Sequence, residues 1–171
     1  MIHIYCGDGK GKTTAAMGLA VRSAGRGNGV VIAQFLKNAD TGERAILGKV
    51  PGVALMDAPE VMKFVFQMTP EERAAERARE TALFQAAAER AVREGAGLLV
   101  LDELCAGVST GMVPLGLVTE FLDHCPGTLE VVITGRDPAA ELLERADYVT
   151  EMRKVKHPFD AGVGPRMGVE A

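Results

Sequence analysis

The chain has 171 residues, of which 47% are hydrophobic and 25% are charged, and its formal net charge is −4. These values fit one globular domain, and they exclude a general attraction to nucleic acid or to an anionic membrane surface. No apolar run approaches the roughly 18 residues that cross a bilayer. The three cysteines are widely spaced and predict neither a disulfide framework nor a zinc site, so we expect reduced thiols in a cytoplasmic protein.

The first elements expected are a strand over residues 2–5, a glycine-rich turn and a buried helix. The turn reads Cys6-Gly7-Asp8-Gly9-Lys10-Gly11-Lys12-Thr13-Thr14. This order predicts a phosphate-binding loop, because glycines let backbone N–H groups converge on an anion at a helix N-terminus. In such a loop Lys12 supplies positive charge to the phosphates, and the Thr13 hydroxyl is placed to bind Mg²⁺. Cys6 stands where the usual pattern has glycine, which indicates a variant loop and an unusual nucleotide orientation.

Further apolar runs alternate with helical segments along the chain. Strands are expected over residues 29–35, 53–56, 97–101, 129–134 and, more weakly, 147–152. Continuously apolar strands separated by helices are typical of a parallel sheet that is covered on both faces. We therefore expect an α/β fold, with a mostly parallel sheet between helices in a single phosphate-loop NTPase-like (RecA-like) domain. That domain would span residues 1–171 and end in a loop or tail from about residue 153.

Two helices have ends that can be predicted. Thr69-Pro70-Glu71-Glu72 is a capping box with proline at the first helical position, and the helix that it begins is expected to run to Glu94 and stop at Gly95. The pair Asp137-Pro138 is expected to cap a short helix that runs towards Arg145.

Charged residues follow two of the strongest predicted strands. Asp102 and Glu103 end the run Leu98–Leu101, and an acid at such a strand end holds Mg²⁺ in phosphate-loop proteins. The alternative is an acidic N-cap of a helix. Arg136 follows the strand that ends at Thr134 and either touches phosphate or lies on the surface. Because the carboxyl ends of parallel strands share one edge, these residues are expected beside the phosphate loop.

Two further segments are candidates for a binding role, because neither has the clear pattern of a core helix or strand. In the run 63–68, Phe64 and Phe66 alternate with smaller residues, so the segment is either a core strand or an apolar wall for a large flat ligand. Near the C-terminus, the run Lys156-His157-Pro158-Phe159 packs poorly as core and suggests a loop folded over a site.

Together these pieces resemble the corrinoid adenosyltransferases of the phosphate-loop type, which transfer the adenosyl group of ATP to cob(I)alamin or its precursors. The resemblance spans nearly the whole chain through eight short motifs in order. They are Gly7–Ala16, Ala20–Gly25, Gln34–Lys37, Gly42-Glu43, Leu101–Leu104, Thr134–Arg136, Ala146–Met152 and Lys156–Phe159.

The resemblance implies a specific chemistry. ATP would bind reversed, with its γ-phosphate where other phosphate-loop proteins hold the α-phosphate, which leaves the ribose C5′ open to attack by Co(I). The implied catalytic residues are Lys12, Thr13 and Glu103, with Mg²⁺ held by Thr13, Glu103 and Asp102. The implied ATP-binding residues are Gly7, Asp8, Gly9, Lys10, Gly11, Lys12, Thr13, Thr14, Arg22 and Arg136.

For Arg22 the resemblance and the helix geometry disagree. The resemblance implies a contact with ATP, whereas the place of Arg22 about three turns into the first helix indicates a solvated or packing arginine.

The implied corrinoid-binding residues are Phe64, Phe66, Lys156 and His157. Many relatives have Phe-Thr-Trp where this chain has Phe64-Val65-Phe66, and the chain has no tryptophan. The resemblance also implies a homodimer, a flavoprotein reductant and an enzyme of the cob(I)yrinic acid a,c-diamide adenosyltransferase type.

Two other functions fit a phosphate loop. One is an ATPase or kinase that cleaves the β–γ bond, and the other is a nucleotide-binding module without catalysis. The product distinguishes them, because a transferase of this type releases triphosphate, an ATPase or kinase gives ADP, and a binding module gives neither.

Overall fold

One six-stranded sheet organises the part of the chain that the computed structural model describes, residues 1–169. Its strands are β1 (Ile2–Cys6), β2 (Val30–Gln34), β3 (Val53–Leu55), β4 (Leu98–Asp102), β5 (Glu130–Thr134) and β6 (Tyr148–Glu151). They lie in the order β3-β2-β4-β5-β1-β6, and every neighbouring pair is parallel. The predicted parallel sheet and single α/β domain are confirmed.

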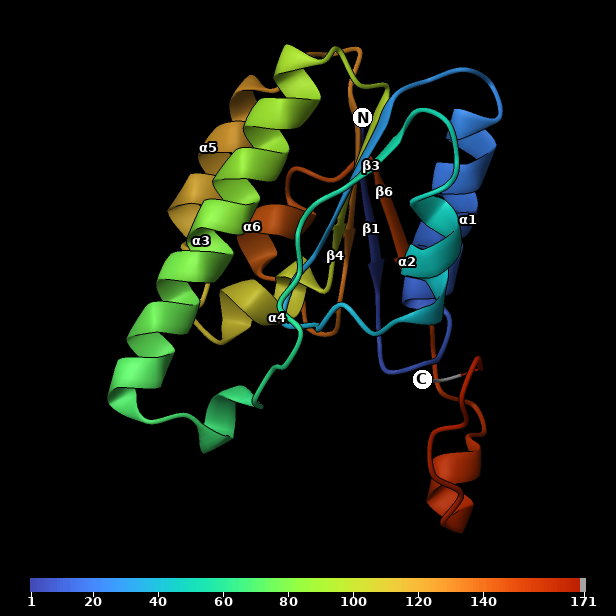
Figure 1. The fold of residues 1–171 in the computed structure, drawn as a ribbon, viewed down its shortest axis with the longest axis vertical. Coiled ribbons are helices and arrows are strands. Elements are labelled where there is room, and N and C mark those ends of the chain that lie inside the picture. Colours follow the sequence, from blue (N-terminus) through green and yellow to red (C-terminus); the bar gives the residue numbers. More distant parts are fainter. Residues whose placement is uncertain (170–171) are drawn as a thin grey trace.

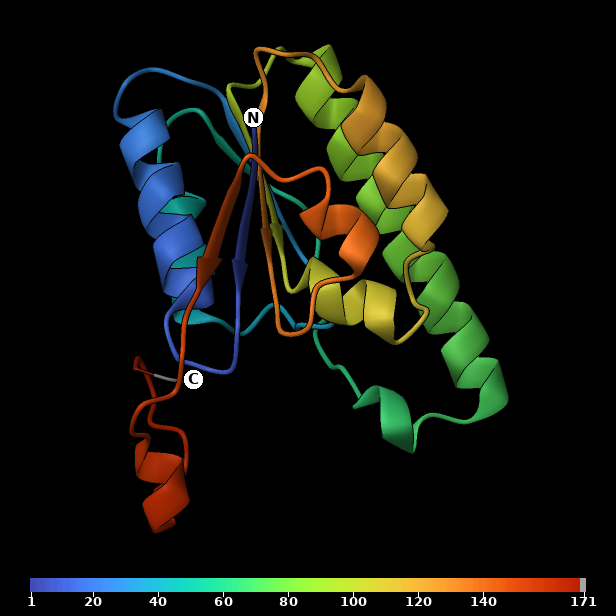
Figure 2. The same ribbon diagram turned by 180° about the vertical axis from the view of Figure 1, so that it is seen from behind.

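Helices cover both faces of this sheet, as expected (Figures 1 and 2). Helices α1 (Lys12–Ala24) and α2 (Gly42–Leu47) lie on one face. The other face carries α3 (Pro70–Arg93), α4 (Leu104–Ser109), α5 (Leu115–His124) and α6 (Ala140–Leu143). Two short 3₁₀ turns, η1 (Val65–Gln67) and η2 (Pro158–Ala161), lie outside these layers. None of the helices within residues 1–169 is long and apolar enough to cross a membrane.

The core consists of two apolar layers, one on each face of the sheet. Every residue of β2 and β4 is buried, which explains why these strands are apolar without alternation. Alternate residues of β4 enter different layers: Leu99 and Leu101 pack with Phe84 of α3, and Val100 packs with Met17 of α1. Because both faces are covered, the loops at the ends of the strands are the places left for a site.

The capping box of α3 is formed as predicted. The Thr69 hydroxyl accepts a hydrogen bond from the backbone N–H of Glu72 (3.2 Å), and the Glu72 carboxylate accepts one from the backbone N–H of Thr69 (3.0 Å). The hydrogen bond from the Lys63 side chain, followed by that from the Thr69 backbone N–H, lowers the pKa of Glu72. Local sequence therefore determines where this long helix begins.

One local prediction was wrong, and one open alternative is decided. Asp137 does not cap α6; Ala139 precedes the helix in an extended conformation, and its carbonyl accepts the first helical hydrogen bonds. For residues 63–68 the sequence left a core strand and an apolar wall open, and the structure shows no core strand: Phe64 precedes the 3₁₀ turn η1, Phe66 lies within it, and the two side chains are 69% and 80% exposed. Their rings stack on each other with centroids 5.5 Å apart, so their apolar surface stays on the outside of the sheet core.

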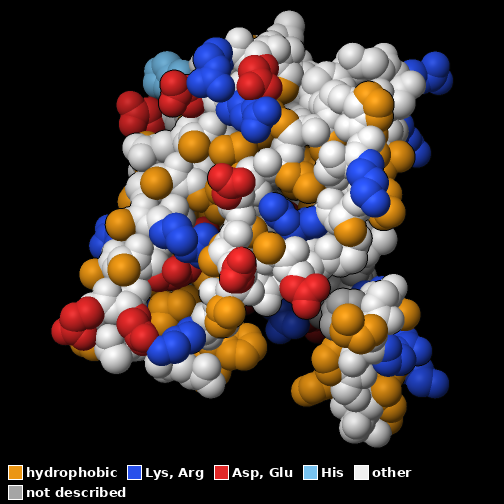
Figure 3. Space-filling view, in the orientation of Figure 1, with side chains coloured by type: hydrophobic (Ala, Val, Ile, Leu, Met, Phe, Trp, Pro, Cys, Tyr) orange, Lys and Arg blue, Asp and Glu red, His pale blue; other side chains and the backbone are white. Residues whose placement is uncertain are grey.

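The C-terminal segment leaves the sheet after β6 and forms a separate lobe beside the carboxyl edge (Figures 1 and 3). Hydrophobic side chains gather on this lobe, and Val155, Phe159 and Met167 are largely exposed. None of the described residues beyond β6 belongs to the buried hydrophobic core.

We predict that Thr69→Ala lowers the free energy of unfolding by about 1 kcal/mol, because the first turn of α3 loses its N-cap acceptor. Chemical denaturation measures this change. Glu89→Ala on the exposed face of the same helix is the control, since its 3.8 Å ion pair with Arg93 is solvated. Equal losses in the two variants would contradict a specific capping effect.

Candidate functional site

The loop between β1 and α1 encloses its own lysine. Lys12 is only 8% exposed, and its ammonium group donates to the backbone carbonyls of Gly7 (2.7 Å) and Gly9 (2.8 Å). Gly7 and Gly11 have φ angles of 100° and 111°, which glycine adopts without strain. The loop therefore carries a fixed positive charge at the N-terminus of α1, the arrangement that binds phosphate.

The glycines of this loop also allow a close contact with the chain just beyond β6, which the sequence did not suggest. The backbone N–H of Gly9 donates to the Met152 carbonyl (2.6 Å), just beyond β6. A Cβ at Gly7 or Gly9 would lie 2.5 or 2.6 Å from that carbonyl oxygen, so no larger residue fits there without a shift. The next residue, Asp8, accepts the backbone N–H of Lys154 at 2.9 Å, and this bond lowers the pKa of Asp8.

A fully buried carboxylate, Asp102 at the end of β4, connects the neighbouring elements. Its Oδ1 atom accepts hydrogen bonds from the hydroxyls of Thr13 (2.9 Å) and Thr134 (2.7 Å). Its Oδ2 atom accepts from the Lys37 ammonium group (2.7 Å) and from the Gln34 side chain (3.2 Å). The carboxylate thus joins the start of α1 to the carboxyl ends of β2 and β5.

Glu103 follows in a left-handed conformation, with φ of 61°, and its backbone N–H donates to the Thr134 hydroxyl (2.9 Å). Its backbone turns away from the strand, and the residue lines the cavity over the phosphate loop while Asp102 stays beneath it. The donors here are carboxylate and hydroxyl oxygens, which Mg²⁺ prefers, so the set fits that ion. Within residues 1–169 no cluster of three or more His, Cys, Asp or Glu side chains provides an all-protein metal site.

Two adjoining cavities occupy this edge of the sheet. The smaller, about 370 Å³, lies over the phosphate loop and is lined by Asp8, Gly9, Lys10, Gly11, Lys12, Thr13, Thr14, Lys37, Glu103, Arg136, His157 and Val169. The larger, about 790 Å³, is walled by Phe64, Phe66, Met62 and Leu36. Thr13, Thr14 and Lys37 line both cavities, so the two spaces meet at the start of α1.

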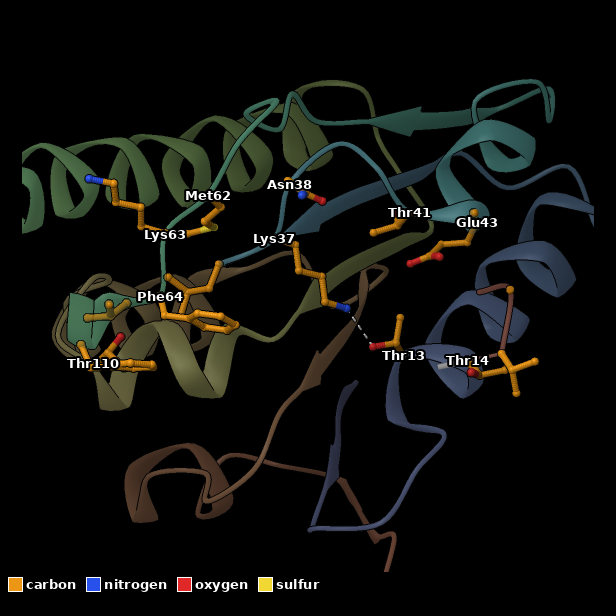
Figure 4. Close-up of a pocket in the computed structure, with 16 residues that line it drawn as sticks. Thr13, Thr14, Lys37, Asn38, Thr41, Glu43, Met62, Lys63, Phe64 and Thr110 are labelled. Atoms are coloured by element: carbon orange, nitrogen blue, oxygen red, sulfur yellow. Dashed lines mark hydrogen bonds between the residues drawn. The ribbon is translucent and has the colours of Figure 1, made fainter. Parts of the chain in front are cut away.

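The larger cavity has chemically different sides (Figure 4). The Lys37 side chain points to Thr13, and its ammonium group donates to the Thr13 hydroxyl at 3.1 Å. Thr41 and Glu43 lie on the same side, and Phe64 lies on the far side of Lys37. A molecule bound in this cavity would therefore contact polar side chains of the protein at one end and exposed aromatic rings of the protein at the other.

Most of the residues singled out in the sequence meet here, and two do not. Gly7 and Asp102 support the loop and the cavity floor from below, whereas Arg136 and His157 line the smaller cavity. Arg22 is exposed near the far end of α1, and Lys156 is exposed in the C-terminal lobe. Neither residue lines the cavities described above, so their binding roles stay predictions.

Sequence reasoning gave no site role to Lys37, Gln34, Glu43 or Arg44. Gln34 donates to the Glu43 carboxylate (3.0 Å) and accepts from the Arg44 guanidinium (3.2 Å), which ties α2 to β2. One feature of the sequence could have pointed to two of them. Gln34 and Lys37 are polar residues at the carboxyl end of a buried parallel strand, which is where ligands bind in such sheets.

A parallel sheet with a glycine loop and a buried lysine at the start of the first helix defines a phosphate-loop nucleotide-binding protein. Comparison with known families is more specific. The model of the family described as ATP:corrinoid adenosyltransferase BtuR/CobO/CobP matches residues 1–171, and the chain belongs to this family.

Individual relatives agree with this assignment. The chain is 39% identical to corrinoid adenosyltransferase CobA of Salmonella typhimurium over 171 residues, covering 99% of this chain and 85% of that protein. It is 36% identical to a corrinoid adenosyltransferase of Pseudomonas aeruginosa, covering 99% and 83% of the two chains. A corrinoid adenosyltransferase of Sinorhizobium sp is 33% identical, with 99% and 79% covered.

We predict that Gly9→Ala weakens ATP binding at least about tenfold, equivalent to roughly 1.4 kcal/mol, because the new Cβ would displace the loop from the Met152 carbonyl. Equilibrium binding measures the effect. Gly18→Ala in α1 is the control, since nothing lies within 4 Å of a Cβ there. Unchanged affinity in Gly9→Ala would show that the loop tolerates the shift.

Proposed function

We propose that the protein transfers the 5′-deoxyadenosyl group of ATP to the Co(I) centre of a corrinoid. Cobalt(I) supplies the electron pair of the new Co–C bond. The bond between C5′ and its oxygen breaks, and triphosphate leaves with the electron pair of that C5′–O bond. Family membership supports the class of reaction. The structural observation that carries the proposal is the junction of the two cavities, one lined by the phosphate loop and one walled by aromatic rings.

On this proposal the phosphate loop stabilises the leaving group. Lys12 offers a buried positive charge, and Arg136 adds an exposed guanidinium on the same cavity. Charge that is already oriented requires no reorganisation when triphosphate departs, which lowers the barrier. Cobalt(I) is itself a strong nucleophile, so no side chain need act as a general base, and the remaining task is to hold C5′ and cobalt in line.

Mg²⁺ would be held by Thr13 and Glu103 together with phosphate oxygens, with Asp102 positioning Thr13 from beneath. When bound, the ion supplies further neutralisation of the triphosphate. Asp102 already accepts four hydrogen bonds from protein groups, so we assign the direct contact to Glu103.

Phe64 and Phe66 would contact the lower face of the corrin ring. Their side chains are exposed at the mouth of the larger cavity and offer apolar surface without a donor atom for cobalt. Such a wall excludes water and other axial ligands, and a Co(II) centre without its axial ligand is easier to reduce. His157 lies on the smaller cavity, and we place Lys156, its neighbour in the lobe, among the groups that contact the corrinoid side chains.

The Co(I) state requires an electron donor, for which we propose a reduced flavoprotein, and we propose a homodimer as the assembly. The substrate type proposed is cob(I)yrinic acid a,c-diamide or a related corrinoid. These three proposals rest on the resemblance to the family.

Anaerobic incubation with ATP, Mg²⁺ and a chemically reduced corrinoid tests the activity. The expected result is loss of the Co(I) absorption together with release of triphosphate. Lys12→Ala is the comparison variant, and its rate should fall 10²–10³-fold, the range typical for loss of one such contact. Release of ADP would identify an ATPase or kinase, and nucleotide binding without any product would identify a binding module.

We predict that Glu103→Ala raises the Mg²⁺ concentration for half-maximal activity about tenfold, because a carboxylate ligand is lost. A Mg²⁺ titration of the initial rate measures this. The control is Glu141→Ala on the exposed surface of α6. If the titration is unchanged, the metal contact belongs to Asp102 instead.

We predict that Phe66→Ala folds and binds ATP normally, since the side chain is 80% exposed, but loses the spectroscopic signal of four-coordinate Co(II). Turnover should slow when reduction limits the rate and recover when the corrinoid is supplied as Co(I). Val61→Ala is the control, because Val61 is an exposed apolar residue that does not line the cavity. A variant with an unchanged spectrum and rate would place the corrin wall elsewhere.

A further inference from the structure

The segment that leaves β2 changes direction at one residue. Phe35 is fully buried, and its backbone N–H donates to the Asp102 carbonyl at 2.9 Å. The next residue, Leu36, has a φ angle of 53°, a left-handed conformation that is unfavourable for a residue with a Cβ by roughly 1–2 kcal/mol. This turn directs the following residue, Lys37, towards Thr13 and Asp102 (Figure 4).

Glu80 of α3 holds this left-handed turn, from the face of the sheet opposite to α1. The Oε1 atom of Glu80 accepts the backbone N–H of Leu36 at 2.9 Å and the Arg79 guanidinium at 2.7 Å. Arg79 also pairs with Glu76 one turn earlier in the helix. A charge-assisted hydrogen bond of this kind can offset the cost of the strained backbone at Leu36.

Glu80 is an unusual residue for this position. Its side chain is fully buried, and its Oε2 atom has no hydrogen-bond partner among residues 1–169. Burial raises the pKa of Glu80, while the Leu36 N–H and Arg79 oppose that rise. A well-packed apolar residue is generally at least as stabilising as a buried, incompletely bonded charge, so stability alone does not explain a carboxylate here.

We propose that Glu80 is a positioning residue for adenosyl transfer, which acts by holding the Leu36 turn so that the Lys37 ammonium group reaches the junction of the two cavities. This inference rests on the proposed function. Glu80 lines neither cavity, whereas Leu36 lines the larger one and Lys37 lines both. Lys37 is therefore the group through which a change at Glu80 reaches the substrates.

The experiment compares Glu80→Leu, which removes the acceptor, with Glu80→Gln, which keeps an oxygen within reach of the Leu36 N–H. Glu80→Leu should lower kcat about tenfold, as expected when a group at the reacting centre is misplaced, and Glu80→Gln should stay within about threefold of the wild type. In a Lys37→Met background, Glu80→Leu should change kcat less than about twofold, because the two residues act as one unit.

A second measurement does not depend on activity. Amide hydrogen exchange at Leu36 should be slow in the wild type and in Glu80→Gln, and fast in Glu80→Leu. If Glu80→Leu does not fold, Glu80→Met replaces it, because the flexible methionine side chain adapts to the same space.

The outcomes separate this inference from the proposed function. If the wild type forms no Co–C bond, the proposed function fails, while amide exchange still tests the contact between Glu80 and Leu36. If the wild type is active and Glu80→Leu matches it, the inference is overturned. An equal loss from Glu80→Leu with and without Lys37 also overturns it, because the effect would then be general destabilisation.

Discussion

The buried carboxylate of Asp102 is the interaction on which the rest of the site depends. A charged group without solvent must be compensated by hydrogen bonds and opposite charge, or it destabilises the fold. Asp102 receives four donors, from Thr13, Gln34, Lys37 and Thr134. The donors come from the start of α1, from the end of β2 and the residues just after it, and from the end of β5, and Asp102 itself ends β4. Satisfying one carboxylate therefore fixes how the first helix and three strand ends meet, and the two cavities open above that junction.

At the carboxyl edge of the sheet, one set of contacts builds the fold and another forms the binding site. Backbone pairing in the sheet brings the strand ends together, whereas side chains of the following residues decide what the space between them can bind. Leu36 and Glu103 both adopt left-handed conformations within two residues of the end of a buried strand. Such strained residues are frequent at functional sites. Here Leu36 lies between the buried Gln34 and the cavity-lining Lys37, and Glu103 lines a cavity directly after the buried Asp102.

Much of this could be predicted from the sequence, because the signals were local. The glycine turn before an apolar helix, the runs without alternation and the box at Thr69 each depend on neighbouring residues, and all three agree with the structure. The parts that were missed depend on long-range contacts. Nothing in the local sequence marks Glu80, because Leu36, the backbone group that it holds, lies 44 positions away and only the fold brings the two together. The exposure of Phe64 and Phe66 was likewise undecided, since alternation fits a core strand and an open wall equally well.

The strand order has a consequence for how the chain acquires its site during synthesis. β1 is made first, yet its two neighbours are β5 and β6, with Ile2 opposite Val131 and Cys6 opposite Glu151. The phosphate loop is then braced by the Met152 carbonyl. Pairing between strands so distant in sequence carries a loop-closure cost that slows folding. β1 must therefore wait for β5 and β6 before it can pair, and the phosphate loop has no brace until Met152, just beyond β6, has also been made.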